Sequence, residues 1–392
     1  MSSRIVVVGG GTAGARLAER LPVTLLGEEP HAPYNRVLLA DVLAGRYGPE
    51  VIALPSPRGG PVRRGTRVTA IDRAARVVRC ADGTAVAYDR LVLATGSNPV
   101  LPPLRGLGGD RLPSGVYAFR TLDDCLALDA RVRPGVRAVV IGGGLLGVSA
   151  ARALAARGAE VMLAQQGEHL MERQLDAHAS GLLRRHLVEL GVEVHTECRV
   201  RGLRCEDGAV RAAELADGFV LDADVVVLAC GVRPRTGLAL AAGLDVRRGI
   251  VVDDRLRTSD PRIHAIGDCA EHAGRLYGLA GAALEQADVL ADLLSGGTTG
   301  YRGTRALTRL SMDALELAAF GEATERPGDD TVRLTDATRS AYRKVVVRGD
   351  RLVGGVLLGD LGAVGALARA WEGDEALPHA PLLHLLTHDG GF

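Results

Sequence analysis

Residues 139–154 read VVIGGGLLGVSAARAL, and residues 5–18 read IVVVGGGTAGARLA. Each stretch is a short apolar run, then the spacing Gly-x-Gly-x-x-Gly, then small and apolar residues with helical spacing. That order predicts a strand, a tight turn and a helix. The first glycine permits the turn, the second lets a pyrophosphate approach the backbone, and the third allows the helix to pack closely on the strand. The chain therefore contains two candidate phosphate-binding loops.

The first loop offers a nucleotide both backbone N–H groups and an acid. Phosphate would lie at the N-terminus of the helix. A ribose-binding acid is expected at the end of the next strand, where the sequence reads LLGEE. Glu28 and Glu29 are the candidates, and we favour Glu28. The loop residues that we expect to bind the cofactor are Gly9, Gly11, Thr12, Ala13 and Gly14.

The second loop has the same glycine spacing, but no acid directly follows the next strand. Its candidate binding residues are Gly142, Gly144, Leu145, Leu146 and Gly147. The strand that follows ends at Gln165 and Gln166. An acid there would bind a ribose 2′-hydroxyl, and an arginine would pair with a 2′-phosphate. Because two glutamines do neither, the choice between NADH and NADPH stays open at this point.

Length and composition restrict the remaining classes. With 392 residues, two or three domains are expected. Balanced charge (47 basic and 47 acidic residues) and 3% aromatic content argue against nucleic acid and membrane partners. No apolar run reaches a membrane span and no signal peptide precedes the first strand, so we expect a cytoplasmic protein, a monomer or a homodimer. The six cysteines form no C-x-x-C pair, so we expect reduced thiols and no metal site.

The order of elements predicts an α/β fold with two doubly wound dinucleotide-binding domains and a small C-terminal α+β domain. Strands with period-two alternation surround the turn Asp82–Gly83. Helices are expected from the second loop to about 157, near 176–190 and over 282–294, and a last helix closes the chain. We expect the first domain at 1–112 and 238–300, the second at 113–237 and the C-terminal domain at 301–392. His264 and Trp371 are expected in cores.

Four further stretches occur in a familiar order: YDRLVLATGSNP (88–99), VVVLACGVRP (225–234), RIHAIGDCAEH (262–272) and YGLAGAALEQA (277–287). With the two glycine loops, they resemble the FAD-dependent pyridine nucleotide-disulfide oxidoreductases. The resemblance implies that the first loop binds FAD and the second binds NADH or NADPH. Asp268 would bind the ribityl chain of the flavin, and His31 and His272 would lie near it without an evident partner. The other residues so implied are Ala94, Thr95, Gly96, Cys230, Gly231, Gly267, Glu285, Gln286 and Ala287.

The segment after the first unit indicates the branch of that superfamily. Residues 31–50 contain no cysteine, which argues against thiol chemistry. EEPHAPYNRVLLADVLAG (28–45) resembles the Tyr-x-Arg-x-x-Leu segment of ferredoxin and rubredoxin reductases and, more closely, the flavin module of assimilatory nitrite and nitrate reductases. EHLMERQLD (168–176) and AYRKVVVRGDRLVGGVLLGD (341–360) resemble the same subgroup.

That subgroup implies hydride transfer to FAD and onward electron transfer. The acceptor would be an iron–sulfur or rubredoxin-like protein, or a nitrite or nitrate reductase component. Two alternatives stay open: a flavoenzyme that acts directly on a small-molecule substrate in a biosynthetic pathway, and a flavin-binding structural or redox-sensing partner.

Two positions depart from ferredoxin reductases. Those relatives commonly have Ser-Lys where this chain has Ala40-Asp41, and Gly-x-Glu where it has Gly147-Val148-Ser149. Loss of both charges together avoids a lone buried charge. The change predicts a flavin site that is retuned in potential, one that accepts another substrate, or neutral divergence. Arg36 and Asp41 are the candidates for shaping the flavin environment.

Overall fold

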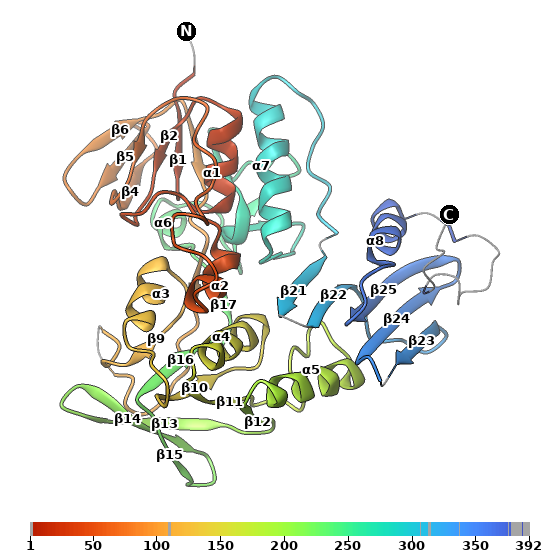
Figure 1. Cartoon of the computed structure of the whole chain (residues 1–392). Coiled ribbons are helices and arrows are strands. Elements are labelled where there is room, and N and C mark those ends of the chain that lie inside the picture. Colours follow the sequence, from red (N-terminus) through yellow and green to blue (C-terminus); the bar gives the residue numbers. More distant parts are fainter. Residues whose placement is uncertain are drawn as a thin grey trace. The chain divides into compact units, whose positions relative to one another are not determined.

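The computed structural model describes residues 3–108, 111–305, 307–312, 315–336, 338–374, 376–377 and 386. Two compact units divide the chain (Figure 1). The first comprises the described parts of Met1–Val100, Arg120–Asp123 and Val232–Thr304. The second comprises those of Leu101–Phe119, Asp124–Gly231 and the chain from Arg305 onward. Each unit is described by itself.

The first unit is built on a parallel sheet of five strands in the order β19-β7-β1-β2-β3. Its central strand IVVV is buried, as expected for β-branched residues covered on both faces of a parallel sheet. Helices α1 and α7 pack against each other, side by side in Figure 1. The bounds are β1 Ile5–Val8, β2 Thr24–Leu26, β3 Val62–Arg63, β7 Arg90–Leu93, β19 Ile263–Ala265, α1 Thr12–Arg20 and α7 Ala280–Leu294.

Smaller elements complete this unit. An antiparallel sheet, β4-β5-β6, turns at Asp82–Gly83 as the sequence predicts. Two short ladders pair β8 with β17 and β18 with β20. The bounds are η1 Arg36–Leu38, α2 Leu39–Leu43, β4 Val68–Asp72, β5 Val77–Cys80, β6 Ala85–Ala87, β8 Ser97–Pro99, β17 Val232–Pro234, α6 Gly237–Ala241, β18 Ile250–Val252, η2 Gly267–Cys269 and β20 Ala270–His272.

The second unit repeats the parallel design in the order β12-β11-β10-β16-β9. Its strand β16 (VVVL) is buried throughout. The bounds are β9 Val116–Tyr117, α3 Leu122–Asp129, β10 Arg137–Ile141, α4 Leu145–Ala156, β11 Glu160–Ala164, α5 Ala177–Glu189, β12 Val192–His195 and β16 Val225–Leu228. An antiparallel sheet follows, with β13 Val200–Glu206, β14 Ala209–Leu215 and β15 Val220–Asp222. The first two residues of α3 pack with the first unit.

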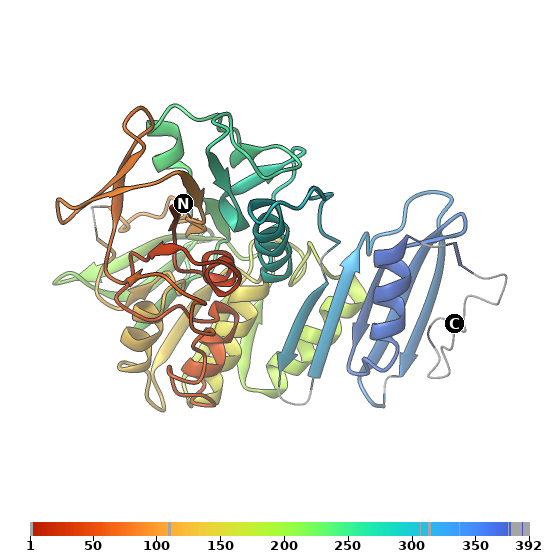
Figure 2. The same ribbon diagram turned by 90° about the horizontal axis from the view of Figure 1, so that it is seen from above.

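The C-terminal part of the second unit is an antiparallel sheet in the order β21-β22-β25-β24-β23. Helix α8 lies across it (Figure 2), and Trp371 packs in the shared core as predicted. The bounds are β21 Thr308–Met312, β22 Leu315–Gly321, β23 Asp330–Asp336, β24 Ala341–Arg348, β25 Arg351–Leu358 and α8 Val364–Gly373.

One buried cation ties this sheet to α5. Lys344 on β24 is 1% exposed, and its Nζ lies 3.0 Å from Asp176 Oδ2 and 2.8 Å from Glu325 Oε2. Tyr342 donates a hydrogen bond of 2.7 Å to the same Asp176 oxygen. Asp176 also caps α5 by accepting from the backbone N–H of Ala179. A buried ammonium is tolerated because two carboxylates surround it.

The structure confirms the predicted fold class and the predicted helices, with α4, α5 and α7 at the expected places. Its two compact units differ from the expected boundaries in several places. Residues 120–123 and 232–237 lie inside the expected second domain but pack with the first unit. The described residues of 101–112, expected in the first domain, pack with the second unit, as do the described residues from Arg305 onward. Residues 120–123 and 232–237 are held on the first unit by polar contacts of Arg120 with Asp268 and of Arg235 with Glu28. The functional domain boundaries stay a prediction.

Within the described part of the chain, no helix combines the length and apolarity needed to cross a membrane.

Candidate functional site

The two glycine loops have the same backbone construction. Gly9 donates to Leu26 O and Gly142 donates to Ala164 O, each at 2.8 Å. Ala94 donates to Val8 O and Ala229 donates to Ile141 O, again at 2.8 Å. Each loop therefore lies at the carboxyl ends of three equivalent strands, β1, β2 and β7 in the first unit and β10, β11 and β16 in the second. The repeat predicted from sequence is a repeat in three dimensions.

Two glycines in each loop are required by close packing. A Cβ on Gly9 (φ +119°) would lie 2.0 Å from Ala94 O, and one on Gly142 (φ +110°) would lie 2.5 Å from Ala229 O. A Cβ on Gly14 would lie 2.0 Å from Gly9 O, and one on Gly147 would lie 1.7 Å from Gly142 O. Because these glycines have no Cβ, each helix can pack directly against its loop.

The middle glycine of each loop faces open space. A Cβ on Gly11 or on Gly144 would have no atom of the described chain within 4 Å. Both residues are N-caps, of α1 and α4, without a side-chain cap for the first N–H groups. Thr12 and Ala13 begin α1, and Leu145 and Leu146 begin α4. Open space beside uncapped N–H groups fits a pyrophosphate in both units.

In the first unit, several predicted residues meet at one edge of the sheet. Gly267 (φ +76°) lies close to Ala13, since a Cβ on it would be 3.1 Å from the Ala13 Cβ. Its N–H donates to Gln286 Oε1 at 2.7 Å, and Gln286 is buried on α7. Thr95 donates to Arg235 O at 2.8 Å, and Gly96 adopts φ +70°. Parallel strands end together here, which explains the convergence.

Helix α7 presents a second uncapped N-terminus in this unit. Glu285 accepts a hydrogen bond of 2.6 Å from Thr304, and Ala287 is fully buried. A 15-residue helix with free N-terminal N–H groups carries partial positive charge at that end. This fits a group that gains negative charge on reduction, such as the pyrimidine edge of a flavin.

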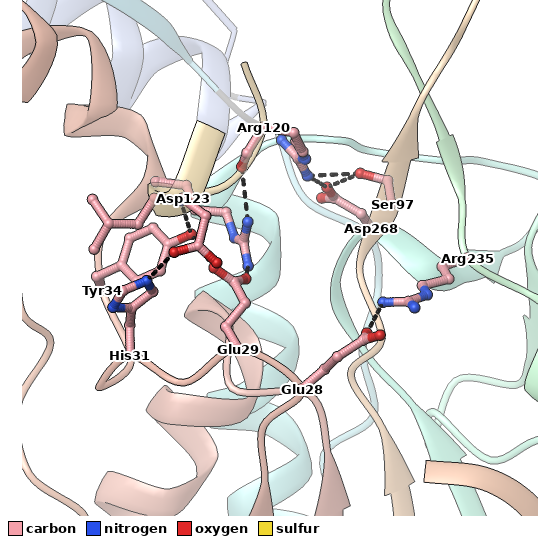
Figure 3. Close-up of polar contacts among 11 residues, drawn as sticks. Glu28, Glu29, His31, Tyr34, Ser97, Arg120, Asp123, Arg235 and Asp268 are labelled. Atoms are coloured by element: carbon pink, nitrogen blue, oxygen red, sulfur yellow. Dashed lines mark hydrogen bonds and ion pairs between the residues drawn. The ribbon is translucent and has the colours of Figure 1, made fainter. Parts of the chain in front are cut away.

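The carboxylate of Asp268 is held by residues that sequence analysis did not select. Arg120 Nη2 lies 2.9 Å from Asp268 Oδ2 and 2.7 Å from Ser97 Oγ (Figure 3). Ser97 also donates to Asp268 Oδ2 at 2.7 Å. Arg120 stands in the motif FRTLDD, and its partner is 148 positions away. No local sequence signal links the two residues.

A second polar cluster contains Arg36 and Glu29. Arg36 donates to Arg120 O at 2.8 Å and forms an ion pair with Glu29. Tyr34 donates to Glu29 Oε2 at 2.6 Å and accepts from Leu122 N–H at 2.9 Å. Burial raises the pKa of the Tyr34 hydroxyl, so it stays a neutral donor. These contacts hold residues 120–122 on the first unit (Figure 3).

Glu28, the favoured ribose acid, pairs with two arginines. Its carboxylate lies 2.5 Å from Arg235 Nη1 (Figure 3). It also lies 3.5 Å from Arg67 Nε. Arg235 follows β17 directly, and its backbone is hydrogen-bonded to Gly96 and Thr95 in the loop after β7, from where its guanidinium reaches Glu28. The ribose role of Glu28 stays a prediction.

The two departures from ferredoxin reductases are satisfied within their own units. Asp41 Oδ1 lies 3.4 Å from Arg46 Nη1. Ser149 donates to Leu145 O at 2.8 Å, one turn back on α4. Neither replacement leaves an isolated charge in the structure. Asp41 lies on α2 and pairs with Arg46 just after that helix, whereas Arg36 pairs with Glu29.

At the second loop, Gln165 and Cys230 flank the glycines. Gly143 donates to Gln165 Oε1 at 2.8 Å, whereas Gln166 is exposed. Cys230 lies 3.5 Å from Ile141 O, and burial raises the pKa of its thiol. A raised thiol pKa means little thiolate at neutral pH, so Cys230 is not an activated nucleophile. Gly231 adopts φ +95° beside it.

Both histidines that sequence analysis placed near the flavin have carboxylate partners. His31 lies 2.6 Å from Asp123, and His272 lies 2.9 Å from Asp254. The partner of His31 comes from the docked segment Arg120–Asp123 (Figure 3). His264 is buried in β19, as predicted.

Comparison with known proteins gives two family matches. Pyridine nucleotide-disulphide oxidoreductase matches residues 3–287, and the rubredoxin NAD⁺ reductase C-terminal domain matches residues 307–372. The solved complex of putidaredoxin reductase with putidaredoxin is similar, with TM-score 0.88 and 27% identity over 98% of each chain.

Curated relatives agree. A nitrite reductase [NAD(P)H] large subunit of Klebsiella oxytoca is 37% identical over 396 residues, 96% of this chain and 41% of that protein. A probable ferredoxin reductase of Castellaniella defragrans is 36% identical over 289 residues, 70% of each chain. The chain spans about half the length, or less, of the nitrite and nitrate reductase relatives. Because the first family match covers most of the chain, the protein belongs to the pyridine nucleotide-disulphide oxidoreductases and is an oxidoreductase that uses FAD and NAD(P)H.

Proposed function

We propose that this protein takes electrons from NAD(P)H through FAD and passes them to a separate redox protein of the iron–sulfur or rubredoxin type, or to a nitrite or nitrate reductase component. The observation that carries the proposal is the pair of equivalent loops in two units, each with an open middle glycine. One site for a nucleotide donor and one for a flavin are what such electron transfer requires. Relatives named as ferredoxin and nitrite reductases support the class of acceptor.

FAD, when bound, supplies the hydride acceptor and the route to one-electron carriers. In this proposal Gly11 and the N-terminus of α1 bind its pyrophosphate, and Asp268 accepts hydrogen bonds from its ribityl hydroxyls. Arg120 and Ser97 fix the orientation of Asp268. In the proposed complex, the N-terminus of α7 stabilises negative charge on the ring system. Arg36 and Asp41 shape the surroundings of the flavin.

The N-terminus of α4 binds the pyrophosphate of NAD(P)H in the second unit. Gly144 leaves the space, and Gly142 and Gly147 hold the loop against the helix. The remaining predicted residues of this site are Gln165, Gln166, Cys230 and Gly231. No acid or base is needed for this role, because hydride transfer depends on positioning of donor and acceptor.

The test is reduction of the purified flavoprotein under anaerobic conditions. Rapid mixing with NADH or NADPH is expected to bleach the flavin absorbance, and cytochrome c is expected to be reduced quickly only after a ferredoxin or rubredoxin is added. Absence of rapid bleaching by either nucleotide contradicts the proposal and favours a structural or sensing role. If added ferredoxin or rubredoxin does not raise the rate of cytochrome c reduction above the rate without it, the proposed onward transfer is contradicted.

One observation favours a second candidate, a flavoenzyme that acts directly on a small molecule. Asp41 replaces the lysine of ferredoxin reductases and pairs with Arg46 on its own segment. An acid on α2 would suit a different acceptor from the one used by those relatives. Turnover of a small-molecule substrate without any carrier protein distinguishes this candidate.

A further inference from the structure

We propose that Lys344 on β24 acts through Asp176 as a positioning residue for the second glycine loop, so that the C-terminal sheet affects how tightly NAD(P)H is bound. The inference rests on the proposed binding of NAD(P)H at that loop, and adds a positioning residue from outside the nucleotide-binding sheet. Lys344 and Asp176 lie 168 positions apart in the sequence (344 − 176), within the same compact unit. A continuous series of contacts connects them to Gly143, between the first two glycines of the motif.

The first contact joins the sheet to the start of α5. Two donors of β24 meet at Asp176 Oδ2, which lies 3.0 Å from Lys344 Nζ and 2.7 Å from the Tyr342 hydroxyl. The other oxygen, Oδ1, accepts from Ala179 N–H at 2.9 Å and caps α5. Burial raises the pKa of Asp176, but these three contacts together outweigh it and hold the pKa below its usual value. The carboxylate is therefore charged at neutral pH and ties the helix to the sheet.

The first turn of α5 holds the loop that precedes the helix. The N–H of Ser180 donates to the Asp176 carbonyl at 2.9 Å, and its Oγ accepts from Leu170 N–H at 2.8 Å. Ser180 and Leu170 are both buried, so the hydrogen bond between them is not readily replaced by one to water. The position of Leu170 therefore follows that of Asp176 and the first turn of the helix.

The next residue of that loop contacts the glycine loop directly. Met171 N–H donates to Gly143 O at 2.9 Å. Met171 has φ +52°, which costs free energy in a residue with a side chain, so its surroundings must hold it in place. Leu170 packs on the same glycine, since a Cβ on Gly143 would lie 2.6 Å from Leu170 Cδ2. A displacement of Leu170 or Met171 is therefore transmitted to Gly143.

Gly143 sets the place of the N–H groups that receive the pyrophosphate. It directly precedes Gly144, the N-cap of α4, beside which the space for a pyrophosphate lies. Those N–H groups bind an anion only when they point at it. Without Lys344, Asp176 loses the cation that holds it to the sheet, and the start of α5 is less firmly fixed. Substitutions in such a series of contacts change affinity at a site that they do not touch by about threefold to thirtyfold.

The test compares two isosteric substitutions, each of which removes one negative charge from beside Lys344. Asp176→Asn keeps an acceptor for the Ala179 N–H and so keeps the helix cap, but it removes the ion pair on the side of the glycine loop. Glu325→Gln is the matched control, because Glu325 Oε2 lies 2.8 Å from Lys344 Nζ on the segment between β22 and β23 of the C-terminal sheet. Lys344→Met is a second test variant, which removes the cation itself.

Binding is measured without turnover. FAD-loaded protein is titrated by calorimetry with tetrahydro-NAD, which cannot donate hydride, and with ADP-ribose, which contains the pyrophosphate but no nicotinamide. Asp176→Asn and Lys344→Met are expected to raise both Kd values by about threefold to thirtyfold, and Glu325→Gln by less than about twofold. Urea unfolding in parallel identifies the variants that are folded at the titration temperature, and either test variant alone is sufficient.

Three results would overturn the inference while the wild-type protein still binds both probes, so that the proposed function stands. They are unchanged Kd values in a folded Asp176→Asn or Lys344→Met variant, an equal rise in Glu325→Gln, and a rise for tetrahydro-NAD without one for ADP-ribose. The last result would place the effect away from the pyrophosphate. A wild-type protein that binds neither probe overturns the proposed nucleotide site together with the inference. No electron acceptor is present, so the acceptor part of the proposal does not affect the result.

Discussion

Substituting the last and the middle glycine of the second loop separates folding from nucleotide binding. A Cβ on Gly147 would lie 1.7 Å from Gly142 O, whereas real Cβ contacts essentially never fall below 3.0 Å. The helix and the loop must therefore move apart by at least 1.3 Å (3.0 − 1.7). Both atoms belong to a closely packed turn, so the strain costs about 1–3 kcal/mol.

Gly144 is the matched control. It has φ −77° and ψ −176°, which any residue adopts, and a Cβ there meets no described atom within 4 Å. Loss of a glycine N-cap and reduced freedom of the unfolded chain oppose each other, so stability changes by less than about 1 kcal/mol. The added methyl group occupies the space into which a pyrophosphate must come, so nucleotide binding is weakened instead.

The assay combines thermal unfolding with calorimetric titration by tetrahydro-NAD, which cannot donate hydride, both on FAD-loaded protein. Gly147→Ala is expected to lower Tm by about 2–4 °C for each kcal/mol lost. Gly144→Ala is expected to leave Tm within a few degrees and to raise the Kd of the nucleotide by about ten- to a hundredfold, because the methyl group weakens hydrogen bonds to the charged pyrophosphate that are worth about 1.5–3 kcal/mol each. Equal Tm losses in the two variants, or unchanged binding by Gly144→Ala, would refute the reasoning.

Three further outcomes are expected from residues outside that loop. Asp268→Ala should purify colourless, because the carboxylate held by Arg120 and Ser97 is lost; stoichiometric FAD in the absorbance spectrum would contradict the assignment. Burial, with the charge of Arg90 in second place, lowers the pKa of His264 to about 4, so the unfolded chain, with a pKa near 6.5, binds a proton that the folded protein does not. Stability should therefore fall as pH drops from about 6.5 toward 4, by up to about 1.4 kcal/mol per pH unit, and a His264→Gln variant should show a flatter profile in urea unfolding. Lys344→Met should destabilise the protein by at most about 3–5 kcal/mol, since it leaves carboxylates without their cation; an unchanged urea midpoint would show that the ion pairs contribute nothing.

The sequence allowed prediction of features that depend on near neighbours. Both glycine loops, the strands before them and the helices after them follow from spacing within about fifteen residues. The turn at Asp82–Gly83 and the place of α7 follow in the same way. The α/β class was predictable because the apolar runs and the helical stretches alternate along the chain.

Contacts between distant segments were not predictable. Arg120 reaches Asp268 across 148 positions of the sequence, and Arg235 reaches Glu28 across 207 (235 − 28). Neither arginine stands out in a sequence with abundant arginine. The ion pair of Asp41 with Arg46 and the hydrogen bond of Ser149 to the carbonyl of Leu145 depend on side-chain rotamers, which composition does not specify.

The ion pairs of Lys344 also make the protein a simple subject for chemical labelling. It is the only lysine in the sequence, and it is 1% exposed between two carboxylates. Amine-reactive reagents cannot modify its side chain while the sheet and α5 stay together. The rate at which such a reagent acylates Lys344 therefore reports how often this part of the second unit opens, and mass spectrometry distinguishes this one lysine from the α-amino terminus, which reacts in any state. Conversely, amine-directed dyes or crosslinkers reach only the α-amino terminus while Lys344 stays buried, so other surface sites should be addressed through arginine, carboxylate or the exposed thiol of Cys205.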